Sequence, residues 1–444
     1  MPLWNLPGDL SAWVVPLALV LDARNRHRLA VLLAGALFAK GRRTVTSWLR
    51  AAGVGAGFRP YYYFLAALGR RAADVARRLL VRVALPLLAA GHERLLFGLD
   101  DTPTKRHGPC VEGAGVHHNP TPGPAGAKFV YGHVWVTLAW LAVHPLWGAL
   151  ALPLLARLYV RRKDVGPLAL WYGWRFQTKL ALAAELIHWL ARWGRWLGKP
   201  LWLAADGAYA KREVLRAARQ EGVVVVSRLR KDAALRSLPG PRPAGRRGRP
   251  AVYGPHALSL AKRAGQRRGW RVGVFELYRK AVRKRYKTFL ATWRPAGGVI
   301  RVVLVREDAG WRAYFSTAAS ASAADILGAV AARSSLEQVF HDVKEVWGAG
   351  QQQLRNLWAN IGAYHLSLWL HTLVEVWAWR RARRRLSDRA DAPWDDAERR
   401  PSHADRRQAL QRECLRAEYR AAGSGRGQKA KIRRLVRRLL QMAP

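Results

Sequence analysis

The chain has 444 residues, more than a single hydrophobic core usually holds, so we expect two to four structural units. Half of the residues are hydrophobic and 24% are charged, which excludes a wholly disordered chain. Lys and Arg number 76 against 29 Asp and Glu, a net charge of +47, and because a surface this positive requires a polyanion we predict a nucleic-acid partner.

The N-terminus and the cysteines indicate the compartment. Met1 to Val20 has no basic segment before its apolar stretch and carries Asp9, which is not typical of a signal peptide. Cys110 and Cys414 can form at most one bridge, which excludes a disulfide framework and a zinc ribbon and favours a reducing compartment. We therefore predict a cytoplasmic protein.

The first 90 residues alternate apolar stretches with Arg-rich ones, and the apolar spacing from Ala72 to Ala90 is helical. This pattern predicts a helical, basic DNA-binding domain over residues 1–90. The pattern changes near Arg94, where the apolar strand LLFGLDD begins, followed by a Gly- and Pro-rich loop from Gly108 to Gly126. We assign residues 91–230 to the first part of an α/β core.

The stretch from Val134 to Val160 is apolar enough to suggest a membrane span. His144, Pro145 and Pro153 interrupt it, and each half then has the length of a buried strand. A two-sided β-hairpin of the core is the preferred interpretation, and a membrane span is the alternative. We therefore predict no membrane partner.

Helices and strands alternate in the next segment. Leu168 to Leu197 has helical spacing of Trp and Leu and predicts one long amphipathic helix. The short apolar strand LWLAAD ends at Asp206, and a helix from Ala210 to Gln220 and the strand VVVVSRL follow. Such alternation is typical of an α/β sheet with some parallel pairing.

The rest of the chain divides into three predicted segments. Residues 231–312 are first rich in Pro and Gly and then strand-like, which predicts a β-rich insertion. Helical spacing returns at Ala323, so residues 313–385 are assigned to the second part of the core. Residues 386–444 are Arg-rich with few apolar runs and predict a basic C-terminal tail.

Acidic residues are scarce, and three of them stand at strand ends. Asp100 and Asp101 follow LLFGL and Asp206 follows LWLAA, at the place where an open α/β sheet presents its ligands. A carboxylate there can also be a turn former or a helix cap, and for each site alone that interpretation stays open. Successive strand residues face opposite sides, so one of Asp100 and Asp101 at most can enter a shared site.

A third acid is expected, because two divalent cations need several carboxylates to neutralise them. In the helical segment ARSSLEQVFHDVKEVWG, Arg333, Glu337 and Lys344 fall within about 40° of one another at about 100° per residue. The alternative is an exposed ladder of surface ion pairs. An apolar stripe that includes Leu336 lies beside these residues, so the charged stripe borders the core.

Together these motifs resemble a known family. The residues concerned are Asp100 with Thr102 in a D-x-T context, Asp206 with Gly207, and Arg333, Glu337 and Lys344 in the spacing Arg-x3-Glu-x6-Lys. Over about residues 94–380 this series resembles the RNase H-like DDE transposases of bacterial insertion sequences, in the branch with a Tyr-x2-Arg-x3-Glu-x6-Lys signature. Val330 stands where that signature has its tyrosine.

The resemblance implies a fold and a site. The expected fold is α/β, an RNase H-like mixed sheet with flanking helices, a β-rich insertion between the second and third catalytic acids and a helical basic N-terminal domain. The expected catalytic and metal-binding residues are Asp100, Asp206 and Glu337, which bind two Mg²⁺ ions, with Mn²⁺ as a substitute. The expected DNA-binding residues are Arg333, Lys344 and Lys105.

The resemblance also implies a function, namely metal-dependent cleavage at element ends and strand transfer by cut-and-paste transposition. The expected partner is double-stranded DNA, as terminal inverted repeats and as target, bound by a homodimer on paired ends in the bacterial nucleoid. A non-catalytic nucleic-acid-binding protein or a decayed transposase relative is the alternative, and a membrane protein ranks third. Terminal inverted repeats flanking the coding region would favour the transposase.

Overall fold

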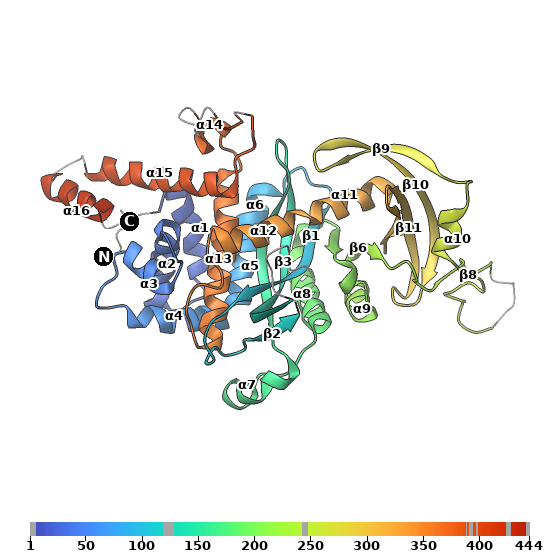
Figure 1. The fold of residues 1–444 in the computed structure, drawn as a ribbon, viewed down its shortest axis with the longest axis horizontal. Coiled ribbons are helices and arrows are strands. Elements are labelled where there is room, and N and C mark those ends of the chain that lie inside the picture. Colours follow the sequence, from blue (N-terminus) through green and yellow to red (C-terminus); the bar gives the residue numbers. More distant parts are fainter. Residues whose placement is uncertain are drawn as a thin grey trace.

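The structure is a computed structural model. It describes residues 6–118, 128–241, 247–387, 389, 394–396, 398–422 and 428–440. Twelve strands in this part of the chain join into one mixed sheet with helices on its faces. Figure 1 shows the N-terminal helices at one end of the molecule, the sheet in the middle and the strands β9 to β11 at the opposite end.

The N-terminal segment is helical, as the sequence predicts. Its helices are α1 (Gly8–Ala18), α2 (Arg26–Phe38), α3 (Val45–Ala51), α4 (Arg59–Arg70), α5 (Ala72–Arg78) and α6 (Leu85–Leu88), with a π-helical turn before α6. A Cβ on Gly69 of α4 would lie 2.0 Å from the Trp358 carbonyl oxygen, and one on Gly362 would lie 2.0 Å from the Leu65 carbonyl oxygen. Two glycines therefore let α4 cross a helix from the other end of the chain in backbone contact, which joins the N-terminal helices to the core.

The central strands are β1 (Leu95–Lys105), β2 (Gly115–His118), β3 (Phe129–His144), β4 (Gly148–Tyr159), β5 (Leu201–Ala205) and β6 (Val224–Leu229). Their order is β2-β3-β1-β5-β6, and β4 pairs with β3 on the edge opposite β1, the edge that β2 also uses. β1, β5 and β6 run parallel, whereas β3 is antiparallel to β1. β2 lies within the segment predicted as a loop, and residues 119–127 of that loop lie outside the described part of the chain.

The apolar stretch from Val134 to Val160 forms the antiparallel pair of β3 and β4, so the predicted core hairpin is confirmed. Its side chains are buried on both faces, because helices cover the pair on either side. Among the described helices, none combines the length and the apolar character that crossing a membrane requires.

The prediction of one long helix from Leu168 to Leu197 is wrong. The segment holds α7 (Val165–Tyr172) and α8 (Lys179–Gly194). Gly173 has a φ of 63°, a left-handed conformation that ends α7, and the Thr178 hydroxyl oxygen accepts a hydrogen bond from the Ala181 amide and so caps α8. The prediction failed because the helical spacing of the Trp and Leu residues continues past Gly173, where the helix ends.

The β-rich segment after β6 contains β7 (Leu235–Arg236), β8 (Ala257–Leu258), α10 (Leu260–Gly265), β9 (Arg271–Leu277), β10 (Lys280–Trp293), β11 (Gly298–Glu307) and β12 (Gly310–Ser316). β12 is antiparallel to β6, with Ala313 opposite Leu229. The inserted strands therefore extend the central sheet, and the boundary predicted at residue 312 falls inside β12.

The remaining helices are α9 (Arg212–Gln220), α11 (Ala323–Arg333), α12 (Ser335–Glu345), α13 (Leu357–Ala378), α14 (Arg383–Leu386), α15 (His403–Ala422) and α16 (Gln428–Leu440). The segment predicted as a tail packs on the core, because α15 buries Arg406, Leu410 and Cys414 and contacts α13 and α2. The sequence predicted a tail because the many Arg residues of this segment interrupt the apolar spacing of its buried face.

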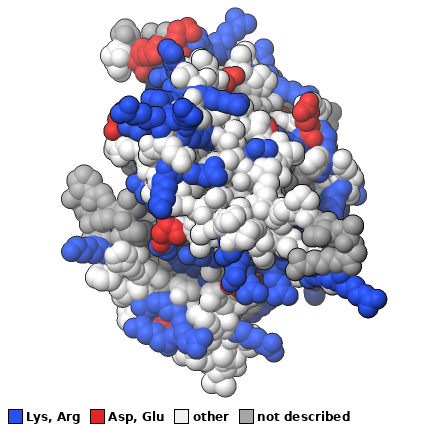
Figure 2. Space-filling model, turned by 90° about the vertical axis from the view of Figure 1, so that its right-hand side faces the viewer, with Lys and Arg blue, Asp and Glu red and all other residues white. Residues whose placement is uncertain are grey.

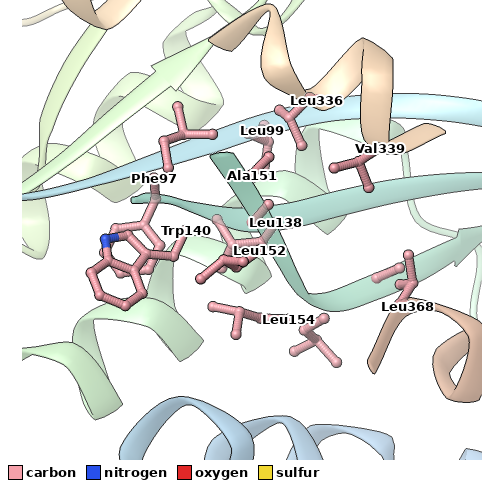
Figure 3. Close-up of a cluster of buried hydrophobic side chains, with 14 of the residues drawn as sticks. Phe97, Leu99, Leu138, Trp140, Ala151, Leu152, Leu154, Leu336, Val339 and Leu368 are labelled. Atoms are coloured by element: carbon pink, nitrogen blue, oxygen red, sulfur yellow. The ribbon is translucent and has the colours of Figure 1, made fainter. Parts of the chain in front are cut away.

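Helix α12 is held against the sheet by apolar packing. Figure 3 shows part of the buried apolar cluster around this contact, with Phe97 and Leu99 of β1, Leu138 and Trp140 of β3, Ala151, Leu152 and Leu154 of β4, Leu336 and Val339 of α12, and Leu368 of α13. Gly98 makes close contact there, since a Cβ on it would lie 2.7 Å from Leu336 Cδ1. The missing side chain lets α12 approach β1, and Glu337 is the neighbour of Leu336.

Candidate active site

Two of the predicted acids lie side by side where the parallel pairing of β1 and β5 ends, with Asp206 directly after β5 and Asp100 inside β1, which continues to Lys105. Leu99 of β1 pairs with Ala205 of β5, so the next residues, Asp100 and Asp206, are neighbours in the same register. Adjacent strands lie about 4.8 Å apart, which sets the spacing of the two backbones. Asp206 also accepts a 3.0 Å hydrogen bond from the Ala208 amide, so the capping role left open by the sequence is present as well.

Arg333 connects these acids to the third. Its Nη1 lies 2.5 Å from Asp100 Oδ2, and its Nη2 lies 3.9 Å from Asp206 Oδ1 and 3.7 Å from Glu337 Oε1. Arg333 ends α11 and Glu337 stands in the first turn of α12, and Ser334 between them keeps helical torsions. We call Asp100, Asp206, Glu337 and Arg333 the carboxylate cluster.

The members of the carboxylate cluster differ in exposure and in proton affinity. The Asp100 side chain is 20% exposed, that of Asp206 45% and that of Glu337 69%. Burial raises the pKa of Asp100 to about 6, although the Arg333 guanidinium and the Asp101 amide oppose the rise. The cluster is thus anchored in the sheet at one side and open to solvent at the other.

Asp101 faces away from this cluster. Its Oδ2 lies 2.6 Å from Lys179 Nζ of α8, and its Oδ1 accepts a 2.7 Å hydrogen bond from the Tyr209 hydroxyl. The alternation of side chains along β1 therefore separates the two neighbouring aspartates, with Asp100 beside Asp206 and Asp101 bound to the opposite face.

The two predicted lysines lie apart from the acids. Lys105 comes five positions after Asp100 on β1, about 17 Å along an extended strand. Burial lowers the pKa of Lys344; Glu345 opposes this effect, and the positive charge of Lys105 adds to it. The structure thus brings together four of the six predicted site residues, whereas Lys105 lies farther along β1 and Lys344 near the end of α12.

The carboxylate cluster has the chemistry that a hard divalent cation requires. Its three acids offer carboxylate oxygens, the ligands that Mg²⁺ and Mn²⁺ prefer. They already surround one cationic group, the Arg333 guanidinium, so the space between them accepts positive charge. The residues present fit a divalent metal site.

A second group of titratable side chains was not predicted. Asp342, His371 and His403 are buried, and one potential ligand atom of each lies within 4.8 Å of the others. We call these three residues, with Glu375 and Arg406, the histidine cluster. They lie on α12, α13 and α15, and no sequence signal joins them, because the histidines are far apart in segments predicted as an apolar helix and a tail.

The geometry of the histidine cluster favours packing over metal binding. The rings of His371 and His403 are stacked, 3.8 Å apart and inclined by 17°, so their in-plane nitrogen lone pairs do not converge on one point. His403 Nδ1 bonds to Glu375 at 2.6 Å, and its Nε2 accepts a 2.8 Å hydrogen bond from the Trp347 indole. Arg406 Nη1 donates to the second Glu375 oxygen at 2.5 Å. The network ties α13 and α15 to Trp347, just after α12.

Basic side chains border the second acid. A hollow of about 440 Å³ has Asp206 on its wall together with Arg228, Arg230, Lys231 and Arg312. Arg230 is paired with Asp232, whereas within the described part of the chain neither Arg228 nor Arg312 has an ion pair with an acid. The hollow therefore offers unpaired positive charge next to the carboxylate cluster.

Comparison with known proteins identifies the family. The DDE superfamily endonuclease family matches residues 16–294, a span that includes Asp100 and Asp206 and ends before Glu337. Comparison with curated proteins gives no match. The match covers more than half of the chain, and the mixed sheet with flanking helices is the RNase H-like fold class that the sequence predicts. The chain belongs to the DDE superfamily endonucleases, enzymes of the nuclease and transposase type.

Proposed function

We propose that the protein is a DNA transposase that cuts the ends of its element and joins them to target DNA, with Asp100, Asp206 and Glu337 as ligands of two Mg²⁺ ions. One observation carries the proposal. In a chain of the DDE superfamily, the three acids meet around a single cationic group where the parallel pairing of β1 and β5 ends. Such a site suits in-line displacement at a phosphodiester.

Each residue has a distinct part in this proposal. The metal pair supplies Lewis acidity and lowers the pKa of the attacking hydroxyl or water. Asp100 is fixed by the sheet and Asp206 by its bond to the Ala208 amide, so both hold rigid positions. Glu337, exposed on the first turn of α12, completes the set from the other side. Arg333 is close enough to bind a phosphate that enters the cluster.

The distribution of cations supports DNA as the substrate. The hollow beside Asp206 would receive the phosphates next to the scissile one, and Arg228 and Arg312 are available to bind them. Figure 2 shows Lys and Arg side chains spread over the end of the molecule that faces the viewer, with few acids among them. Exposed cations of β9 and β10 at this end include Arg271, Lys280, Arg283 and Arg285.

The remaining parts of the proposal follow from the resemblance and the net charge. The DNA would be the terminal inverted repeats of the element and a target duplex, held by a homodimer that pairs two ends, in the cytoplasm at the nucleoid. Lys105, about 17 Å along β1 from Asp100, and Lys344, about two turns along α12 from Glu337, would bind the backbone of the same duplex farther from the reacting phosphate.

The decisive experiment compares Glu337→Gln with Glu345→Gln, an exposed acid on the same helix that lies outside the carboxylate cluster. Nicking of a duplex that carries the element's ends is measured with Mg²⁺, with Mn²⁺ and with a chelator. We expect Glu337→Gln to lose at least about 10³-fold in rate, because one of few metal ligands is gone. Glu345→Gln should cleave like wild type.

DNA binding supplies the second readout. Affinity should fall steeply for wild type and for Glu337→Gln alike between about 50 and 200 mM salt, because phosphate contacts by Lys and Arg dominate it. Cleavage by Glu337→Gln at the wild-type rate would reject the proposed site. Binding without any metal-dependent cleavage by wild type would instead support the non-catalytic alternative.

A further inference from the structure

Arg333 has an unusual position for a residue expected to bind DNA. Within the described part of the chain its guanidinium is the cation that lies within 4 Å of all three acids of the carboxylate cluster. Its side chain is 18% exposed, far less than that of Glu337, so it lies between the acids rather than above them. In the absence of DNA the acids are already partly neutralised.

The guanidinium and a metal ion compete for the same oxygens. Asp100 Oδ2 accepts a hydrogen bond from Arg333 Nη1, and a carboxylate oxygen bound so closely to an N–H donor has one lone pair fewer for a metal. Like charges also repel, and repulsion is strong near a side chain as buried as Asp100. A divalent ion therefore binds the cluster more weakly while Arg333 remains in place.

A DNA phosphate offers Arg333 an alternative partner. Guanidinium groups bind phosphate in a bidentate manner, and the Arg333 side chain can turn about its own torsions while the backbone at the α11 and α12 junction stays helical. The basic hollow beside Asp206 brings the phosphates of a bound strand close to this junction.

We propose that Arg333 is a positioning residue that acts as the internal counter-cation of Asp100, Asp206 and Glu337 in the DNA-free protein, and that metal ions load when a DNA phosphate draws its guanidinium away. The inference rests on the proposed function and adds an order of binding to it. Because linkage is reciprocal, DNA raises metal affinity and the metal raises DNA affinity by the same factor. The carboxylate cluster therefore binds metal ions weakly until DNA is present.

The test measures Mn²⁺ binding rather than cleavage. Free Mn²⁺ is titrated against the full-length protein by electron paramagnetic resonance, with and without an end-containing duplex, at constant ionic strength. Wild type should bind Mn²⁺ at least about tenfold more tightly with DNA than without. Arg333→Ala should bind Mn²⁺ without DNA about tenfold more tightly than wild type, and DNA should add little.

Three further variants control this experiment. Lys163→Ala removes an exposed cation outside the carboxylate cluster and should leave DNA-free Mn²⁺ binding unchanged. Arg333→Gln keeps side-chain length and hydrogen bonding without the charge, so it should reproduce the gain if Arg333→Ala folds poorly. Adding Glu337→Gln to Arg333→Ala should cancel the gain, which would locate the bound ion in the carboxylate cluster.

Equal DNA-free Mn²⁺ affinity in wild type and in both Arg333 variants would overturn the inference. So would a wild-type affinity that DNA does not change. If wild type still cleaved DNA with Mn²⁺ in that case, the proposed function would stand without the counter-cation role. If Asp206→Asn and wild type bound Mn²⁺ equally with DNA present, the carboxylate cluster would not be a metal site, and both proposals would fail.

Discussion

The carboxylate cluster and the histidine cluster lie near opposite ends of the same helix, α12, and use similar side chains in different ways. In the carboxylate cluster three acids face one cation, and one of the acids is 69% exposed. In the histidine cluster Glu375 and Arg406 balance each other, and His403 and Glu375 are each 2% exposed. One cluster reaches the surface through an exposed acid, and in the other the central ion pairs of Glu375 are buried.

This difference separates a site from a structural network better than residue type does. Histidines and acids in close proximity suggest a metal centre, yet the stacked rings of the histidine cluster and the bonds of His403 leave no convergent ligands. The carboxylate cluster lacks histidine altogether, but its excess negative charge can be balanced only by added cations. Unbalanced charge within reach of solvent is therefore the more informative sign of function.

The largest expected effect on stability comes from Glu375. Burial alone would raise its pKa, but Arg406 and then His403 hold the pKa well below its usual range. Glu375→Gln leaves Arg406 charged and buried without its partner, and breaking a buried pair in this way costs about 3–5 kcal/mol of the free energy of unfolding. Urea denaturation measures this loss.

Glu337→Gln is the matched variant in the carboxylate cluster. Because its side chain is mostly exposed, we expect a change of at most about 1 kcal/mol in the free energy of unfolding. A large loss from Glu337→Gln, or none from Glu375→Gln, would contradict the division between a functional and a structural cluster.

The pH dependence of stability offers a second comparison. Burial lowers the pKa of His371 well below its usual value, with further contributions from His403 and Arg406 that Glu375 opposes. Below about pH 6.5 the unfolded chain binds a proton at this residue that the folded chain does not, so stability falls as pH falls, by up to about 1.4 kcal/mol per pH unit. His371→Leu should make this slope shallower by that amount.

The apolar replacement is tolerable at neutral pH, because the buried Nδ1 of His371 has no hydrogen-bond partner to lose. His27→Leu, at an exposed position of α2, is the control and should leave the slope unchanged. An unchanged slope in His371→Leu would mean that His371 titrates normally in the folded protein, in conflict with its burial.

The sequence predicted those parts of the site that depend on local pattern. Asp206 follows the end of β5, and parallel pairing makes Asp100 its neighbour, although β1 continues past Asp100 to Lys105. Glu337 and Arg333 follow helical spacing, and their side chains lie 3.7 Å apart although Arg333 ends α11 and Glu337 belongs to α12. What the sequence could not predict is the position of the Arg333 guanidinium among the acids, because that depends on how α12 packs on Gly98.

The sequence failed where a single residue or a distant partner decides the structure. Gly173 breaks a helix whose apolar spacing is otherwise continuous. The predicted tail becomes core because α13 offers Glu375 to His403 and Arg406, three residues separated by a long stretch of chain. Neither effect changes the periodicity of apolar residues in the sequence. The first is a backbone torsion, and the second is a long-range pairing of buried polar groups.

A difference in expected stability also distinguishes the two neighbours on β1. Asp101→Asn loses the charge that binds Lys179 but keeps an acceptor for the Tyr209 hydroxyl, and because the pair is partly exposed we expect a loss of about 1–2 kcal/mol. Asp100→Asn removes a carboxylate whose burial raises its pKa to about 6, so its ionised form is already disfavoured, and stability should change less.

Cleavage should rank the two variants in the opposite order. Asp100→Asn removes an oxygen ligand beside Asp206 and should abolish metal-dependent nicking, whereas Asp101→Asn, on the other face of β1, should retain most of it. Unfolding curves and nicking rates measured on the same preparations give both rankings. If Asp101→Asn lost cleavage while remaining as stable as wild type, Asp101 would take the role proposed for Asp100, and Lys179 rather than Arg333 would be the cation nearest the first acid.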